Sequence, residues 1–449
     1  VSFYAIISYH RLIMPSPSTP AWQKLSQFKT PPQRTRRSLL TVLQGGRPQS
    51  TPQTHKEIRN LLPSSSELAT QLTSTPMASA NSQSSTSRMR IKEQQDLLGL
   101  EFKYGAVFEH ADFATYLYRE TVPDEMIEAY FQSSKLSGSR GWKNLPRNWQ
   151  AVLEDELYPI YTKILEDILK YRAETTGQNI RQVYDTHEKL LAHREPDGPA
   201  LKSKPDITIV GQGPSFEKPD KGHVGYSNAT TIIELKKQSE ACFKADFAQV
   251  AVYARCALVS SRRSVWLLMN VLRQIFIQQP NRRFVRTLIC TDKTFRLVHF
   301  DRSGAVSSPE YDINNHRILF VRLVLGITSH DEKEVGLDTS IRWEIDAKGK
   351  KGKGTITVDG VDYEIVPDEA PFLRYVIRGR GTTGWIAIDP QTKRRVHIKK
   401  YWRAEDRTRE AELLKQAKDV KGVCHLYRAM EGETTGDLRG KNVLPRIPF

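Results

Sequence analysis

The chain has 449 residues, 39% of them hydrophobic, and a formal net charge of +16 at pH 7. This length allows two or three domains with large cores. Residues 1–90 hold eleven Lys and Arg but only two Asp and Glu, which accounts for +9 of the net charge. The basic character is therefore mainly a property of a tail, and it is weak support for a nucleic-acid-binding core.

The four cysteines are scattered, and no two of them have C-x-x-C spacing. A disulfide framework or a zinc site is therefore not expected, and a reducing compartment suits the chain. The sequence also contains no run of ~18 uncharged apolar residues, the length that a membrane helix needs. We expect an intracellular protein, nuclear or cytoplasmic, without membrane contact.

Composition divides the chain into four segments. Residues 1–92 are rich in Ser, Thr, Pro and Gln and predict a disordered basic tail. Residues 93–328 combine a long amphipathic helical pattern over 148–176 with short β-prone runs, and they predict a helical and α/β region. Residues 329–370 predict a linker and a β-hairpin with an Asp-Gly turn, and residues 371–449 predict strands around a glycine turn, then one helix. The expected fold class is α+β.

Three charged residues lie at the ends of two predicted strands. Asp206 begins one strand, and Glu234 and Lys236 end another, which follows after a loop rich in Gly and Pro. Strand ends meet in a hairpin, so Asp206 and Glu234 are predicted to share one divalent metal ion. Alternation places Glu234 and Lys236 on the same strand face. Two carboxylates suit Mg²⁺, which polarises a phosphodiester, while the lysine positions or activates the attacking water.

These residues resemble the PD-(D/E)xK nuclease superfamily. Further along, Gln249 and Tyr253 are four residues apart on one face of a predicted helix. This pair is similar to the helical motif of RecB-like members, in which it orients the metal site and the DNA. An upstream acid often completes such sites, and Asp185 and Glu188 are both candidates. The resemblance implies a metal-dependent DNA nuclease; a nuclease fold without activity, or an ordinary strand ending in solvated charges, are the alternatives.

A glycine-rich turn forms the second candidate site. Gly379, Gly381 and Gly384 stand in the string GRGTTGWI, and the string VHIK ends fifteen residues later at Lys399. A dinucleotide-binding fold would open a helix after such glycines, whereas here β-prone residues follow. The pattern predicts a glycine-rich hairpin and the lysine-bearing strand of a protein-kinase N-lobe. A glycine-turn hairpin without a nucleotide is the alternative.

In this interpretation the glycine turn and the lysine bind ATP. Backbone amides between Gly379 and Gly384 can approach the phosphates because no Cβ intervenes, and Lys399 neutralises the α- and β-phosphates. A helical glutamate should pair with the lysine, and the string REAELL offers Glu410 or Glu412. Glu410 fits the usual pattern better because an apolar pair follows it.

Both sites, in this order, resemble the fungal-type protein kinase family. The resemblance extends from about Glu101 to Gly440. It implies a kinase that uses ATP and Mg²⁺ to phosphorylate a protein substrate, with ATP bound by the three glycines and Lys399. The strings that carry it are KPDI, IIELK, FAQVAVYAR, QPNRRFV, HFDRSG, GLDTSI, GRGTTGW, VHIKKYW, REAELLKQA and GVCHL.

The sequence departs from the family pattern in two ways. No H-R-D and no D-F-G string follows Lys399, so the aspartates that accept the hydroxyl proton and hold Mg²⁺ are missing. Phosphoryl transfer depends on these groups, and we therefore expect an incomplete or inactive kinase, truncated at its C-terminal end. Residues 256–273 separate two strings that adjoin in the family, and we interpret them as a retained intron.

Three hypotheses follow. The first is a truncated kinase of the serine/threonine type, with a nuclease-like α/β domain before a partial N-lobe made of an antiparallel sheet and one helix. The second is a metal-dependent nuclease whose basic tail helps to hold nucleic acid. The third is a non-catalytic, ATP-binding pseudokinase module.

Overall fold

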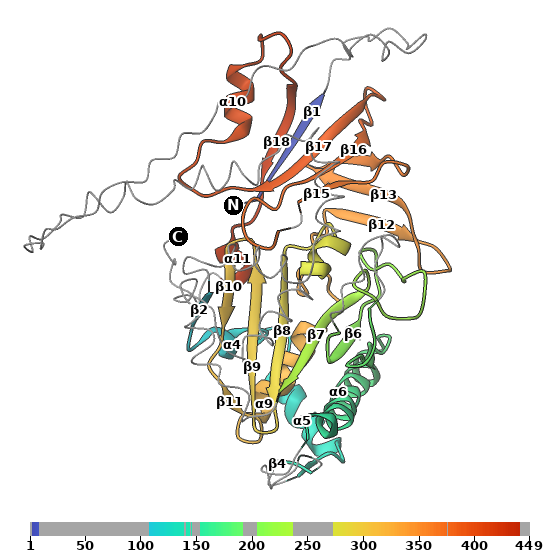
Figure 1. Cartoon of the computed structure of the whole chain (residues 1–449), viewed down its shortest axis with the longest axis vertical. Coiled ribbons are helices and arrows are strands. Elements are labelled where there is room, and N and C mark those ends of the chain that lie inside the picture. Colours follow the sequence, from blue (N-terminus) through green and yellow to red (C-terminus); the bar gives the residue numbers. More distant parts are fainter. Residues whose placement is uncertain are drawn as a thin grey trace, which may run out of the picture. The chain divides into compact units, whose positions relative to one another are not determined.

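The computed structural model describes residues 2–8, 107–138, 141–143, 145, 153–191, 204–236, 273–374 and 376–440. All of them belong to one compact unit formed by residues 1–9 and 83–449. Helices and two large sheets make up this unit, so the predicted mixed class of helices and sheets is confirmed (Figure 1). No helix in the described part of the chain is long and apolar enough to cross a membrane.

The first sheet, which we call the Asp206 sheet, has the strand order β2-β10-β9-β8-β7-β6-β5, with β11 paired to β9. Most neighbours are antiparallel, but β7 is parallel to β8 and β2 is parallel to β10. Every residue of β7 and β8 is buried, as expected for central strands covered on both faces. The strands are β2 (Val107–Glu109), β5 (Gln182–Asp185), β6 (Ile207–Val210), β7 (Ala229–Lys236), β8 (Phe284–Thr291), β9 (Thr294–Asp301), β10 (Gly304–Ser307) and β11 (Tyr311–Asp312).

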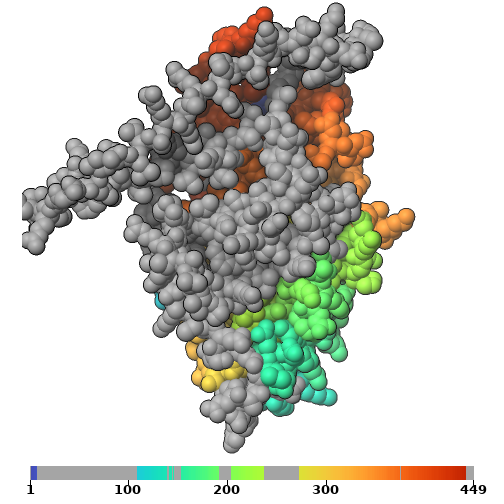
Figure 2. Space-filling view, in the orientation of Figure 1, coloured from blue at the N-terminus to red at the C-terminus, as the bar shows by residue number. Residues whose placement is uncertain are grey.

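Four helices share an apolar core with strands β6 to β9. The longest, α6, covers most of the helix predicted over 148–176. It ends at Gly177, whose φ of 68° is the left-handed conformation that closes many helices. Figure 2 shows the outer surface of α6 in teal to green. The helices are α4 (Phe113–Tyr116), α5 (Asp124–Ser133), α6 (Glu154–Thr176) and α9 (Arg317–Ile327), and a small hairpin, β3 (Ser137–Gly138) and β4 (Gly141–Trp142), lies between α5 and α6 in the sequence.

The second sheet, which we call the Lys399 sheet, has the order β12-β13-β14-β16-β17-β1-β18, with β15 paired to β16. Its own apolar core includes Trp385, Ile398 and Ile6. Helix α10 (Glu410–Gln416) lies between β17 and β18 in the sequence, and α11 (Thr435–Arg439) follows β18. The strands are β1 (Ser2–Ser8), β12 (Ile341–Ile345), β13 (Lys351–Val358), β14 (Val361–Ile365), β15 (Phe372–Leu373), β16 (Thr383–Ile388), β17 (Arg395–Trp402) and β18 (His425–Glu431).

The Asp-Gly turn joins β13 and β14 as the sequence predicts. Asp359 and Gly360 have φ values of 53° and 74°, and Val358 pairs with Val361 across the two-residue turn. Positive φ at both central residues is the turn geometry that matches the twist of a two-stranded hairpin.

Strand β1 differs from the disordered tail predicted for residues 1–92. Residues 2–8 are inserted between β17 and β18, and the side chains of residues 2–7 are buried. The sequence SFYAIIS is apolar on both faces, which suits a strand covered from both sides. The rest of the predicted tail lies outside the described residues.

Candidate functional site

The glycine turn lies between β15 and β16. Gly379 and Gly381 have φ values of 111° and 45°, which favour glycine. The N–H of Gly379 donates a 2.7 Å hydrogen bond to the carbonyl oxygen of Arg302, in the turn after β9. A Cβ at Gly381 would lie 2.4 Å from Nε of Arg302. The turn is therefore shaped by close contact with Arg302 as well as by its own backbone.

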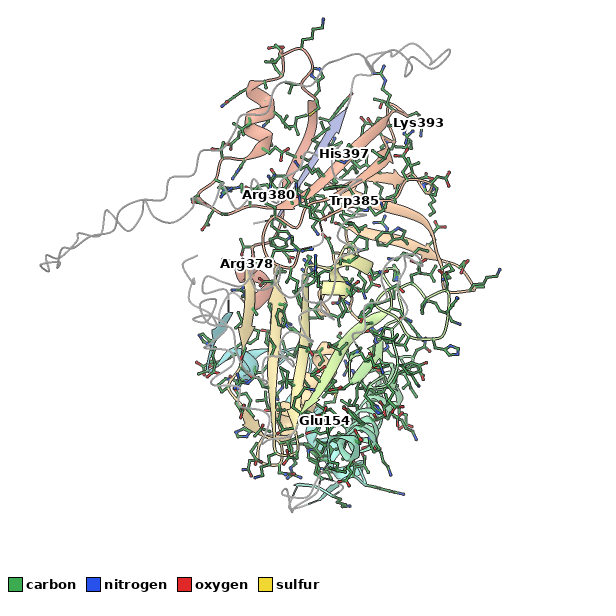
Figure 3. The ribbon with its side chains drawn as sticks, in the orientation of Figure 1. Glu154, Arg378, Arg380, Trp385, Lys393 and His397 are labelled. Atoms are coloured by element: carbon green, nitrogen blue, oxygen red, sulfur yellow. The ribbon has the colours of Figure 1, made fainter. Side chains whose placement is uncertain are left out.

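Gly384 has a different role, because it lies within β16. It pairs with Lys399 in register, and a Cβ there would lie 2.6 Å from Nε2 of His397. His397 is two residues from Lys399 and so shares its strand face. Burial lowers the pKa of His397, and the charge of Lys399 lowers it further. Figure 3 labels Arg380 of the glycine turn, Trp385 of β16 and His397 of β17.

Lys399 forms an ion pair with the first residue of α10. Its Nζ lies 2.6 Å and 2.7 Å from the two carboxylate oxygens of Glu410. The structure thus brings together the lysine and the glutamate that the sequence analysis preferred. Glu412 instead lies beside Arg409, with the nearest charged atoms 3.7 Å apart. Arg380 of the glycine turn also approaches Glu410, at 3.4 Å.

This face of the Lys399 sheet has the chemistry of an anion site. Two cationic groups, Lys399 and Arg380, share one carboxylate, so the cluster keeps a net positive charge. Glu410 fixes the position of the ammonium, and an ammonium held this way can donate to a phosphate oxygen without first being ordered. The sequence analysis did not predict His397, or that its imidazole requires a residue without a Cβ at position 384. Both depend on which side chains face each other across two strands.

The second site lies where β6 begins and β7 ends. Oδ2 of Asp206 accepts a 2.7 Å hydrogen bond from the N–H of Leu235 and lies 3.4 Å from Nζ of Lys236. The same Nζ lies 3.2 Å from Oε1 of Glu234. All three predicted side chains are brought together and are almost fully buried.

A third acid joins this group from α6. Oε1 of Glu154, the first residue of the helix, lies 3.5 Å from Nζ of Lys236 (Figure 3). The two acids considered from sequence contact His187 instead: Oδ1 of Asp185 lies 2.5 Å from Nδ1 of its imidazole, and Oε1 of Glu188 lies 4.0 Å from Nε2. The signal for Glu154 was a run of three successive carboxylates within the helix predicted over 148–176, which the structure places in the first turn of α6.

Burial and mutual repulsion set the protonation of this cluster. Burial raises the pKa of Glu234, and the nearby carboxylate of Asp206 raises it further. Burial also raises the pKa of Asp206, although Lys236 opposes this. Burial opposes the charge on Lys236, but Glu234, Asp206 and Glu154 together raise its pKa above the usual range. The ammonium of Lys236 therefore interacts with all three acidic side chains of the cluster.

The carboxylate of Glu234 has oxygen atoms that could still bind a cation. Among the described residues, Oε2 of Glu234 has no hydrogen-bond partner, and Oε1 has only the ammonium of Lys236 beside it. Asp206 and Glu234 could therefore contribute two oxygen ligands to a metal ion. A group of three or more His, Cys, Asp or Glu placed to hold a metal is not found in the part of the chain that the structure describes.

Two predicted residues cannot be placed. Gln249 and Tyr253 lie in residues 237–272, outside the described part of the chain. The segment interpreted as a retained intron, 256–273, lies there too except for its last residue.

The chain matches the model of a known protein family. A family model described as fungal protein kinase matches residues 204–438, just over half of the chain. The matched range includes Asp206, Glu234, Lys236 and the whole Lys399–Glu410 site. No curated protein and no solved structure matches the chain.

Proposed function

Because the chain belongs to the fungal protein kinase family, we propose that its Lys399 sheet is a kinase N-lobe that binds ATP. The observation that carries this proposal is the ion pair between Lys399 and both carboxylate oxygens of Glu410. Kinases use a lysine held by a helical glutamate to bind the phosphates of ATP. The glycine turn and Arg380 lie beside this pair and add positive potential.

The residues around the phosphates would have separate tasks. Lys399 would donate to the α- and β-phosphates, and Glu410 would hold its ammonium in place. The N–H of Gly379 is already bonded to Arg302, so amides that follow it in the turn would meet the phosphates. Mg²⁺ would enter with ATP and neutralise part of the phosphate charge.

Phosphoryl transfer needs groups beyond these. After Lys399 the sequence has no H-R-D or D-F-G string, which would supply the proton-accepting and metal-binding aspartates. We therefore assign ATP binding to the residues of this chain and regard phosphorylation of a protein substrate as the activity of the family.

The test is titration of the intact chain with ATP and Mg²⁺ by calorimetry. Replacing Lys399 with Met should weaken binding about tenfold or more, since a charge-assisted contact to phosphate is lost. Lys415→Met is the matched control, because Lys415 is an exposed lysine of α10. ATP binding of unchanged affinity in Lys399→Met would refute the proposal.

A second function is favoured by the Asp206 cluster. The approach of Asp206, Glu234, Lys236 and Glu154 suits a metal-dependent phosphodiesterase acting on DNA. Asp206 and Glu234 would hold Mg²⁺, which supplies a Lewis acid to the phosphodiester. The raised pKa of Lys236 keeps its amine charged, so it would stabilise negative charge or orient water but could not accept a proton. The basic residues in 1–90 would add contacts to the DNA backbone.

Plasmid DNA incubated with the purified chain and Mg²⁺ or Mn²⁺ tests this second function. Cleavage should be lost in Glu234→Ala and in Lys236→Ala. It should remain in Asp155→Ala, which removes an exposed carboxylate next to Glu154. Cleavage that persists in Glu234→Ala would assign the activity to another source.

A further inference from the structure

Strands β17 and β18 follow one another in the described chain, yet they are not neighbours in the sheet. Each is antiparallel to β1, so they are parallel to each other. Parallel strands need a crossover connection, and here α10 lies in that connection. The crossover leaves a slot one strand wide between β17 and β18 (Figure 1).

Residues 2–8 lie in this slot and pair with both of its sides. On one side the pairing runs from Ser2 opposite Trp402 to Ile7 opposite His397. On the other side it runs from Phe3 opposite Glu431 to Ser8 opposite His425. Without β1, the facing edges of β17 and β18 would lose their backbone hydrogen-bond partners, which is costly for buried groups.

The side chains of β1 match the core face of the slot. Ile6 is 1% exposed and belongs to the apolar core of the Lys399 sheet. The hydroxyl of Tyr4 donates a hydrogen bond to Asp338, and the ammonium of Lys400 donates to the same carboxylate. The slot therefore selects an apolar strand with a hydroxyl at one position.

The opposite face of β1 supports the Lys399–Glu410 pair. The ring of Phe3 stacks on Tyr401 with centroids 5.6 Å apart, and Nζ of Lys399 lies 5.4 Å from the Tyr401 centroid. Arg409, the residue before Glu410, lies over the ring of Phe3 at 6.0 Å. None of the residues of α10 is buried, so the helix depends on such contacts for its position.

Strand β1 is held in the slot by backbone pairing with β17 and β18, and it is not connected to either strand by a short loop in the described chain. The next described residues after Ser8 form β2, which belongs to the other sheet. In other proteins, an extended peptide from a separate chain binds by the same backbone hydrogen bonds, as an added strand at an open sheet edge.

We infer that the slot between β17 and β18 is a strand-binding site for the sequence of residues 2–8, and that its occupation is required to assemble the Lys399–Glu410 site. The second half of this inference rests on the ATP binding proposed above.

The first test uses the full chain with Ala5→Cys and Ala429→Cys, two positions directly opposite each other in β1 and β18. Paired antiparallel positions are close enough for a disulfide. Oxidation followed by non-reducing gels and peptide mapping should find this bond. A bond within one chain supports the slot, and a bond between two chains supports it with the strand supplied by a second copy. If neither the intrachain nor the interchain bond forms, the slot is overturned. Ala5→Cys with Ala387→Cys is the control, since β16 does not pair with β1.

The second test uses the chain without residues 1–8 and a synthetic peptide of residues 2–8. The shortened chain should bind ATP at least about tenfold more weakly, and the peptide should restore binding. A peptide with Ile6→Asp should bind about 100-fold more weakly, because it buries a charge. A scrambled peptide controls for composition.

The outcomes separate the two proposals. If the intact chain binds no ATP, the proposed function fails, and the disulfide still decides the slot. If the shortened chain binds ATP as tightly as the intact one, the slot is not needed for the Lys399 site. If the shortened chain does not fold, ATP titration of the full chain with Phe3→Ala replaces it, and unchanged affinity would overturn the coupling.

Discussion

A buried ion pair joins α11 to the Asp206 sheet, and removing its carboxylate should be costly. Arg439 binds both oxygens of Asp301 at 2.7 Å and 2.8 Å, and both residues are at most 3% exposed. Nε2 of His299 lies 3.0 Å from the same carboxylate, and the N–H of Ser303 donates to it at 2.7 Å. Asp301→Asn keeps the shape but leaves the buried guanidinium of Arg439 without a counter-charge.

The magnitude can be worked out in two ways. Breaking a buried ion pair by removing one partner costs about 3–5 kcal/mol. Burial opposes ionisation of Asp301, but its hydrogen bond to His299 and the charge of Arg439 lower its pKa to about 2. At about 1.4 kcal/mol per pKa unit, this shift corresponds to about 2 kcal/mol of stability at neutral pH. We expect Asp301→Asn to lower the free energy of unfolding by about 3 kcal/mol.

Urea unfolding at pH 7, followed by circular dichroism, measures this loss. Asp346→Asn is the control, because Asp346 is exposed. The double variant Asp301→Asn with Arg439→Gln should recover part of the loss, since the uncompensated charge is gone. An Asp301→Asn variant as stable as the parent chain, or a double variant with additive losses, would refute the role of the charge pair.

His299, Gly384 and Gly336 should each give a measurable response to substitution. Burial lowers the pKa of His299 to about 4, below its value of about 6.5 in an unfolded chain, so the unfolded state binds more protons between these values. The free energy of unfolding should therefore fall by about 3 kcal/mol as pH drops from 6.5 to 4, and urea midpoints for His299→Gln should show a flatter dependence; equal slopes would contradict this assignment. Gly384→Ala should displace the imidazole of His397, which shares the strand face of Lys399, and weaken ATP binding about tenfold or more. His397→Ala should restore binding in calorimetric titrations; no rescue would show that His397 is not the obstacle. Gly336 has a φ of 93°, and a Cβ there would lie 2.2 Å from the carbonyl oxygen of Phe284. Gly336→Ala should lower the free energy of unfolding in urea by more than about 1 kcal/mol. The loss should exceed that of Gly177→Ala, because Gly177 also has a positive φ but has open space around it. Equal losses would mean that the contact with Phe284 relaxes.

The sequence predicts local parts of both sites well because their spacing follows simple periods. Glu234 and Lys236 are two residues apart on a strand, so their shared face follows from alternation. Glu410 was preferred over Glu412 from the apolar pair that follows it, and the structure places Glu410 against Lys399. In both cases the partners lie within one or two adjacent elements.

The parts that could not be predicted depend on packing between distant segments. Glu154 reaches Lys236 because of where α6 packs on the Asp206 sheet, 82 residues away in sequence. Strand β1 was hidden because its partners in β17 and β18 lie near the opposite end of the chain. Composition assigned it to the surrounding Ser- and Pro-rich segment, although its own residues are apolar. Pairing over such distances leaves no local pattern.

Asp301 and Arg302 are adjacent, but they hold different parts of the Lys399 region. Asp301 holds α11 through Arg439. The guanidinium of Arg302 donates to the carbonyl oxygen of Ile377 at 3.2 Å, and the backbone carbonyl oxygen of Arg302 accepts from the N–H of Gly379 at 2.7 Å. Hydrogen bonds weaken steeply when their angle departs from linear, so these contacts restrict how the glycine turn can lie against Arg302. The glycine turn is therefore positioned by the turn that follows β9 of the Asp206 sheet. A fragment that begins at residue 371 would contain Gly379, Gly381, Gly384 and Lys399. It would lack Arg302, the residue that orients the glycine turn.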